Sequence, residues 1–95
     1  MAELDGVWDV RRTGGALPPL VGVRKRIRGD RGETVLPGGL GVPFVVRGRE
    51  LRYRAPFAMV VDVLAPDGDG WRGRATVFGR TVGEFALTRR GSSAS

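Results

Sequence analysis

The chain has 95 residues, which is enough for one domain with a modest core. It contains neither cysteine nor histidine. This excludes disulfides, catalytic arrangements that need a histidine or a thiolate, and the usual zinc sites. The net charge is +6, with fifteen arginines and a single lysine, so polyanions must be considered as partners. A GC-rich codon bias is the alternative cause of the arginine excess.

Short alternating runs separated by glycines predict an all-β domain, since no segment has a sustained helical period. No apolar run approaches the ~18 residues that cross a bilayer, and the first residues lack the layout of a signal peptide. We expect one domain over residues 1–90 in the cytoplasm and a flexible tail over 91–95. The predicted strands are 6–13, 20–28, 32–36, 43–47, 50–54, 57–65, 71–78 and 82–89.

Glycine-containing pairs between these strands predict hairpin turns. Gly29-Asp30 and Gly48-Arg49 place glycine where a two-residue turn needs φ > 0. The Arg-Gly-Asp tripeptide at 28–30 is therefore interpreted as a turn and not as an adhesion motif. "PDGDG" at 66–70 is interpreted as a tight turn, because no glutamate closes it as in a calcium-binding EF-hand loop.

Two registers follow from the alternation of side chains. A turn at 48–49 places Phe44 opposite Tyr53 on one face of the sheet. A three-residue loop at 79–81 would place Ala75 opposite Phe85, and Trp71 opposite Arg89.

Eight strands joined by tight loops predict an up-and-down antiparallel barrel, because closure removes the exposed edges of a meander. Half-barrels completed by a second copy are the alternative. The side chains expected to point inward are Trp8, Val10, Val21, Val23, Ile27, Phe44, Val46, Leu51, Tyr53, Met59, Val61, Val63, Trp71, Ala75, Val77, Phe85 and Leu87.

The two termini resemble those of calycins, the superfamily of lipocalins and fatty-acid-binding proteins. "LDGVWDVRR" at 4–12 is similar to their opening strand, with Gly6 and Trp8 matching its Gly-x-Trp. Arg89 or Arg90 in "EFALTRR" is similar to the basic residue that stacks over that tryptophan and closes the barrel. The resemblance covers about a dozen residues, and it implies a lumen that binds a small apolar or amphiphilic molecule.

The expected ligand site is the inner wall of the barrel, although core packing is the alternative role for both tryptophans. Asp62 interrupts the apolar stretch "MVVDVL". It is either an anchor inside the lumen for a cationic or hydroxylated ligand, or half of an outward ion pair with Arg72 or Arg74. The candidate lumen residues are Trp8, Phe44, Tyr53, Met59, Asp62, Trp71 and Phe85.

The leading hypothesis is therefore a small ligand-binding barrel with no catalytic residues, metal or cofactor. The alternatives are a structural or protein-interaction module and polyanion binding through surface arginines. Nucleic acid is disfavoured because Tyr53 faces away from Arg52 and Arg54, whereas a stacking platform needs aromatic and cationic groups on one surface. No membrane partner is expected, and a homodimer is left open.

Overall fold

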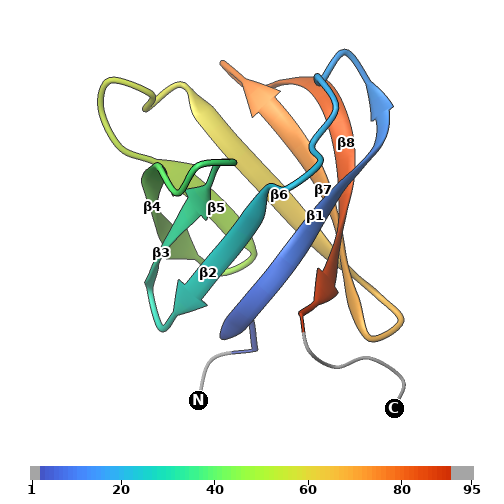
Figure 1. Cartoon of the computed structure of the whole chain (residues 1–95). Coiled ribbons are helices and arrows are strands. Elements are labelled where there is room, and N and C mark those ends of the chain that lie inside the picture. Colours follow the sequence, from blue (N-terminus) through green and yellow to red (C-terminus); the bar gives the residue numbers. More distant parts are fainter. Residues whose placement is uncertain (1–2, 91–95) are drawn as a thin grey trace.

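The computed structural model describes residues 3–90, which form a closed eight-stranded antiparallel barrel (Figure 1). Each strand pairs with its neighbours in the chain, and β8 pairs with β1, so the predicted all-β up-and-down barrel is confirmed. The half-barrel alternative is wrong, because closure occurs within one chain. The predicted tail at 91–95 lies outside the described residues. The strands are β1 (Gly6–Gly15), β2 (Arg24–Arg28), β3 (Arg31–Val35), β4 (Gly41–Arg47), β5 (Glu50–Tyr53), β6 (Val60–Asp67), β7 (Gly70–Val77) and β8 (Arg80–Arg89).

The predicted hairpin turns are present. Arg28 pairs with Arg31 and Arg47 with Glu50, so each hairpin has a two-residue turn with glycine at positive φ. Phe44 lies opposite Tyr53 as predicted, and their rings meet edge to face with centroids 5.4 Å apart. The Arg-Gly-Asp tripeptide lies at the tip of the β2–β3 hairpin. Gly68 and Asp69 form the tight turn between β6 and β7.

The predicted register of the last hairpin is wrong. Val77 pairs with Arg80, so Phe78 and Gly79 form a two-residue turn with φ of 50° and 80°. Trp71 lies opposite Leu87, and Gly73 rather than Ala75 lies opposite Phe85, with a bulge between Ala75 and Thr76. The pattern did not reveal this turn because a bulky side chain is rare at positive φ.

The inward face of β6 is also displaced by one residue from the prediction. Asp62 and Leu64 are buried, whereas Val61 and Val63 are only half-buried and Met59 lies before the strand. The strand begins at Val60, and a shift of one residue turns every side chain to the other face. Val21, also expected inside, is 85% exposed in the connection that precedes β2.

The two ends of the barrel differ. The terminal end carries the turns 29–30, 48–49 and 68–69, and it is closed by Trp8, whose indole Nε1 donates to Leu4 O at 2.9 Å. The guanidinium of Arg89 lies 4.2 Å from the centroid of the Trp8 ring, the arrangement that the calycin resemblance implied for Arg89 or Arg90. The opposite, loop end carries the connections 16–23, 36–40, 54–59 and 78–79. No helix within residues 3–90 is long and apolar enough to cross a bilayer.

Two glycines make room for the largest rings of the core. Gly32 lies opposite Phe44 and Gly73 opposite Phe85. A Cβ atom on Gly73 would lie 2.2 Å from the Phe85 ring, and one on Gly32 would lie 2.6 Å from the Phe44 ring. Each ring therefore occupies the space that a side chain on the neighbouring strand would take.

Candidate functional site: a buried charged cluster beside an interior cavity

The only lysine of the chain lies inside the barrel. Lys25 is on β2 between Val23 and Ile27, and all three side chains are buried because alternate residues of the strand point inward. Its ammonium Nζ donates to Thr34 Oγ1 at 2.7 Å and to Tyr53 Oη at 2.8 Å. Asp62 Oδ2 lies 3.0 Å from the same nitrogen, so three partners account for the three donors of the ammonium.

Asp62 and Tyr53 complete the buried charged cluster, which we define as Lys25, Thr34, Tyr53 and Asp62. Tyr53 Oη donates to Asp62 Oδ2 at 3.1 Å and lies within hydrogen-bond distance of Thr34 Oγ1. The pairing Leu51–Asp62 places the carboxylate of β6 on the same inner face as Tyr53 of β5. Four different strands thus each contribute one polar side chain to the interior.

Lys25 and Tyr53 both keep their protons at neutral pH. Burial favours the neutral amine of Lys25, but the Asp62 carboxylate and the Tyr53 oxygen outweigh burial and raise the pKa of Lys25 above its ordinary 10.5. Burial also raises the pKa of Tyr53 above 10.0; Lys25 opposes this shift and Asp62 adds to it. A protonated lysine is not a nucleophile and a protonated phenol is not a base.

Aromatic rings surround the ammonium group. Lys25 Nζ lies 5.5 Å from the ring centroids of Phe44 and Tyr53 and 5.4 Å from that of Phe85. These distances are within the ~6 Å at which a cation and a ring attract each other. The rings therefore compensate in part for the water that the ammonium has lost.

A partly open cavity of about 170 Å³ lies beside the cluster. Lys25, Thr34, Tyr53 and Asp62 line one side of it, and the remaining lining is apolar: Val10, Leu17, Leu20, Val23, Val60, Ala75 and Phe85. Leu17 and Leu20 come from the 16–23 connection, which folds over the loop end and packs against the core. A second, open hollow of about 250 Å³ shares Thr34, Tyr53 and Val60 with the cavity and extends to Phe57.

The structure brings together only some of the predicted lumen residues. Tyr53, Asp62 and Phe85 line the cavity, whereas Phe44 is core beside Lys25. Trp8 and Trp71 are buried, and a guanidinium stacks over each; Arg49 lies 5.3 Å from the ring of Trp71. Met59 lies in the 54–59 connection and does not line the cavity.

The partner of Asp62 was predicted incorrectly. Arg72 and Arg74 lie on the outer face of the neighbouring strand, whereas Lys25 reaches Asp62 across the interior. Sequence reasoning missed Lys25 and Thr34, because Lys25 stands in the basic run "RKRIR", which has the composition of a solvated face. The alternation of Val23, Lys25 and Ile27 was the available signal that Lys25 points inward.

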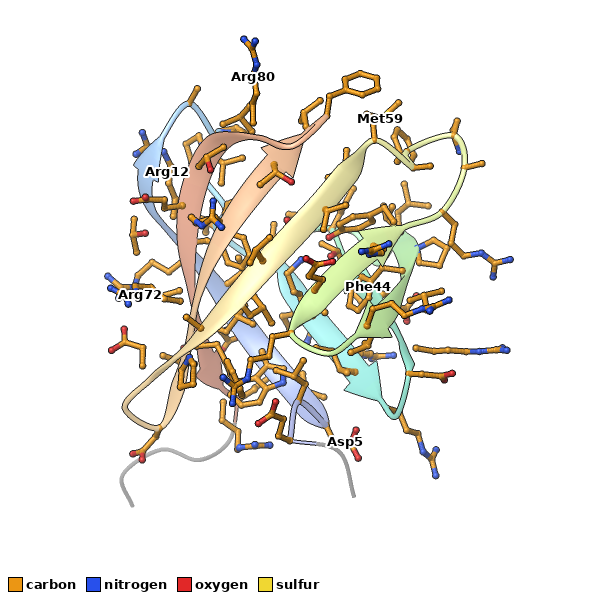
Figure 2. The ribbon with its side chains drawn as sticks, turned by 180° about the vertical axis from the view of Figure 1, so that it is seen from behind. Asp5, Arg12, Phe44, Met59, Arg72 and Arg80 are labelled. Atoms are coloured by element: carbon orange, nitrogen blue, oxygen red, sulfur yellow. The ribbon has the colours of Figure 1, made fainter. Side chains whose placement is uncertain are left out.

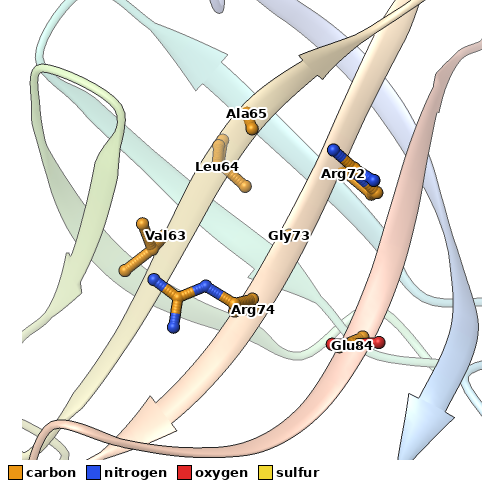
Figure 3. A pocket seen from close by; sticks show the side chains of 7 residues that line it. All are labelled: Val63, Leu64, Ala65, Arg72, Gly73, Arg74 and Glu84. Atoms are coloured by element: carbon orange, nitrogen blue, oxygen red, sulfur yellow. The ribbon is translucent and has the colours of Figure 1, made fainter.

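The arginines are spread over the outer wall of the barrel. A shallow depression of about 330 Å³ crosses β6, β7 and β8, where Arg72 and Arg74 lie near Glu84 (Figure 3). Within residues 3–90, ion pairs with carboxylates are formed by Arg26, Arg31, Arg49, Arg52 and Arg90. Carboxylates therefore accompany the arginines at each of these places.

Comparison with models of protein families, with curated proteins and with solved structures finds no match to this chain.

Proposed function

We propose that the barrel binds a small, neutral, hydroxylated apolar molecule in its interior cavity. The observation that carries this proposal is the buried charged cluster, which forms one side of an otherwise apolar cavity. The Gly-x-Trp strand and the stacked Arg89, which resemble calycin features, support it as well.

The cluster is difficult to explain by stability alone. Removing two charges from water costs several kcal/mol per ion, and apolar residues of similar volume often replace a buried ion pair with no loss of stability. Lys25 and Asp62 are 3% and 4% exposed, so the full desolvation cost applies. Ionisable groups held beside a cavity are characteristic of binding sites.

The contacts within the cluster favour a neutral hydroxyl over a charged ligand. Lys25 and Tyr53 both contact Oδ2 of Asp62, so Oδ1 is the acceptor that a ligand hydroxyl would use. A ligand cation would be repelled by the Lys25 ammonium. A ligand anion would be repelled by the Asp62 carboxylate, and it would find the three donors of Lys25 already bonded. A cavity of about 170 Å³ suits one aromatic ring, since an engineered apolar cavity of roughly 150 Å³ binds benzene.

Titration with four probes tests the proposal. Phenol, benzene, benzylammonium and benzoate are added in turn while NMR follows the methyl groups of Val10, Val23 and Val60, which line the cavity. We expect saturable shifts with phenol, weaker binding of benzene, and none with the two ions. Absence of saturable shifts with both phenol and benzene would refute the proposal.

Two variants provide controls. Ala75→Leu fills the cavity and should abolish binding, whereas Ala65→Leu, on the outer face of β6, should leave it unchanged. The double substitution of Lys25 to Met and Asp62 to Leu should retain benzene binding and remove the preference for phenol. A preference that survives this double substitution would show that the cluster does not contact the ligand.

A further inference from the structure

We propose that the loop end docks on the surface of an anionic lipid bilayer. The exposed large apolar side chains of residues 3–90 all lie at or next to this end. They come from all four of its connections and from the start of β8, and their exposed fractions are 36% or more: Val21, Leu36, Leu40, Phe57, Phe78 and Val82.

The segments that carry these side chains adjoin one another at the loop end, and we call the six side chains the apolar rim. Gly22 lies against the side chain of Pro37, which joins the first two connections. Phe57 lies beside Val42 at the open hollow. Phe78 N donates to Met59 O at 2.9 Å, and Ala16 N donates to Val82 O at 2.8 Å. An exposed apolar rim of this kind marks an interaction site.

The positive charge beside the rim favours an anionic partner. The rim segments 14–23, 36–41, 54–59 and 78–82 contain Arg54 and Arg80 but no aspartate or glutamate. Figure 2 shows Met59, Arg12 and Arg80 at this end, and Asp5 at the opposite end. Apolar side chains beside arginines suit an interface of acyl chains and anionic headgroups.

Phe78 provides a separate argument. It adopts φ of 50° in a turn whose next residue, Gly79, has φ of 80°. Asparagine followed by glycine is the preferred pair for such a turn, and a bulky residue there is strained. The Phe78 side chain is nevertheless 80% exposed, so no packing within the described residues compensates for the strain. Strain without a structural reason is typical of functional positions.

A second copy of the chain is a poorer occupant of the rim. Two rims facing each other would place Arg54 and Arg80 of one molecule near the same cations of the other, with no carboxylate in these segments between them. The sequence predicted no membrane partner, and this proposal departs from that prediction. Contact through short loops at the surface does not depend on ligand binding inside the barrel.

Co-sedimentation of the full chain with lipid vesicles tests the proposal. We expect binding to vesicles of equal parts phosphatidylcholine and phosphatidylglycerol, weaker binding to phosphatidylcholine alone, and a loss of binding as salt is added. Phe78→Asn should reduce the partition coefficient about tenfold without lowering the melting temperature, because asparagine suits the turn. Replacing Arg54 and Arg80 by glutamine should reduce it roughly fivefold for each charge.

Controls separate the rim from general basicity. Arg47→Gln and Arg72→Gln, away from the rim, should reduce binding much less than the two rim substitutions. Equal losses from both pairs, or unchanged binding of Phe78→Asn, would overturn the proposal. Failure to bind the mixed vesicles at low salt would also overturn the proposal. If ultracentrifugation then shows a dimer that Phe78→Asn dissociates, the rim is an interface between two copies of the chain.

Discussion

Removing one member of the buried ion pair should be far more damaging than removing both. Lys25→Met leaves the Asp62 carboxylate in the core without its cation, and Asp62→Leu leaves the ammonium without its anion. Each single change is expected to cost about 3–5 kcal/mol, the usual penalty for an uncompensated buried charge. The pair is 3.0 Å apart and its side chains are 4% and 5% exposed, so solvent screens neither charge.

The double variant should recover most of this loss. Replacement of a buried pair by apolar residues of similar size is often neutral or stabilising. The hydroxyls of Tyr53 and Thr34 lose a charged partner, at roughly 1 kcal/mol each, but they remain within hydrogen-bond distance of each other. We therefore expect the double variant to lie within about 2 kcal/mol of the native chain, whereas additivity would predict a loss of roughly 6–10 kcal/mol.

Urea unfolding followed by the fluorescence of Trp8 and Trp71 measures these values. A domain of 95 residues has a stability of roughly 5–14 kcal/mol, so an additive loss would unfold a domain in the lower half of this range and would be measurable as a large shift in the upper half. The exposed pair Arg52–Glu50, at 2.7 Å, is the matched control. Its removal should cost less than about 1 kcal/mol. Single substitutions of Lys25 or Asp62 that cost no more than this control, or a double variant that does not fold, would refute the reasoning.

Three further predictions concern the same core. The free energy of unfolding should be constant through neutral pH and should fall as the pH rises above about 10. The pKa values of Lys25 and Tyr53 are raised in the folded state, so these groups hold their protons after the unfolded chain has lost them. Urea unfolding at increasing pH measures this, and a free energy that does not fall above about 10 would contradict the raised pKa values. Gly73→Ala should cost about 1–3 kcal/mol by displacing the Phe85 ring, and should shift the ring resonances of Phe85, whereas Gly14→Ala, which faces only the Glu84 side chain, should cost less. Arg89→Met should lower the free energy of unfolding by about 0.5–2 kcal/mol, because it removes the cation from the Trp8 ring. Arg90→Met should lower it less, because the partner of Arg90, Asp9, is exposed. Equal melting temperatures of these two variants would show that the stacking contributes nothing.

The alternation of side chains determined the fold class and most of the strand pairing. Phe44 and Tyr53 fell on one face because a two-residue turn at Gly48-Arg49 leaves a single register that buries both. The prediction failed where the backbone departs from regular geometry. The bulge at Ala75 and the positive φ of Phe78 moved the last hairpin, and the register of β6, which begins at Val60, turned Val61 and Val63 outward.

The sequence alone determined a closed up-and-down barrel, since this follows from local turns and from pairing between strands adjacent in the sheet. The stacking of Arg89 over Trp8 was implied by the resemblance of the termini to calycins and not by the predicted registers, which placed Arg89 opposite Trp71. Only the tertiary structure decided that Lys25 and Asp62 meet, because they lie on non-adjacent strands and reach each other across the interior. It also decided that the exposed apolar residues of four separate connections gather at one end. Both features depend on closure and on strand tilt, which no local pattern of residues records.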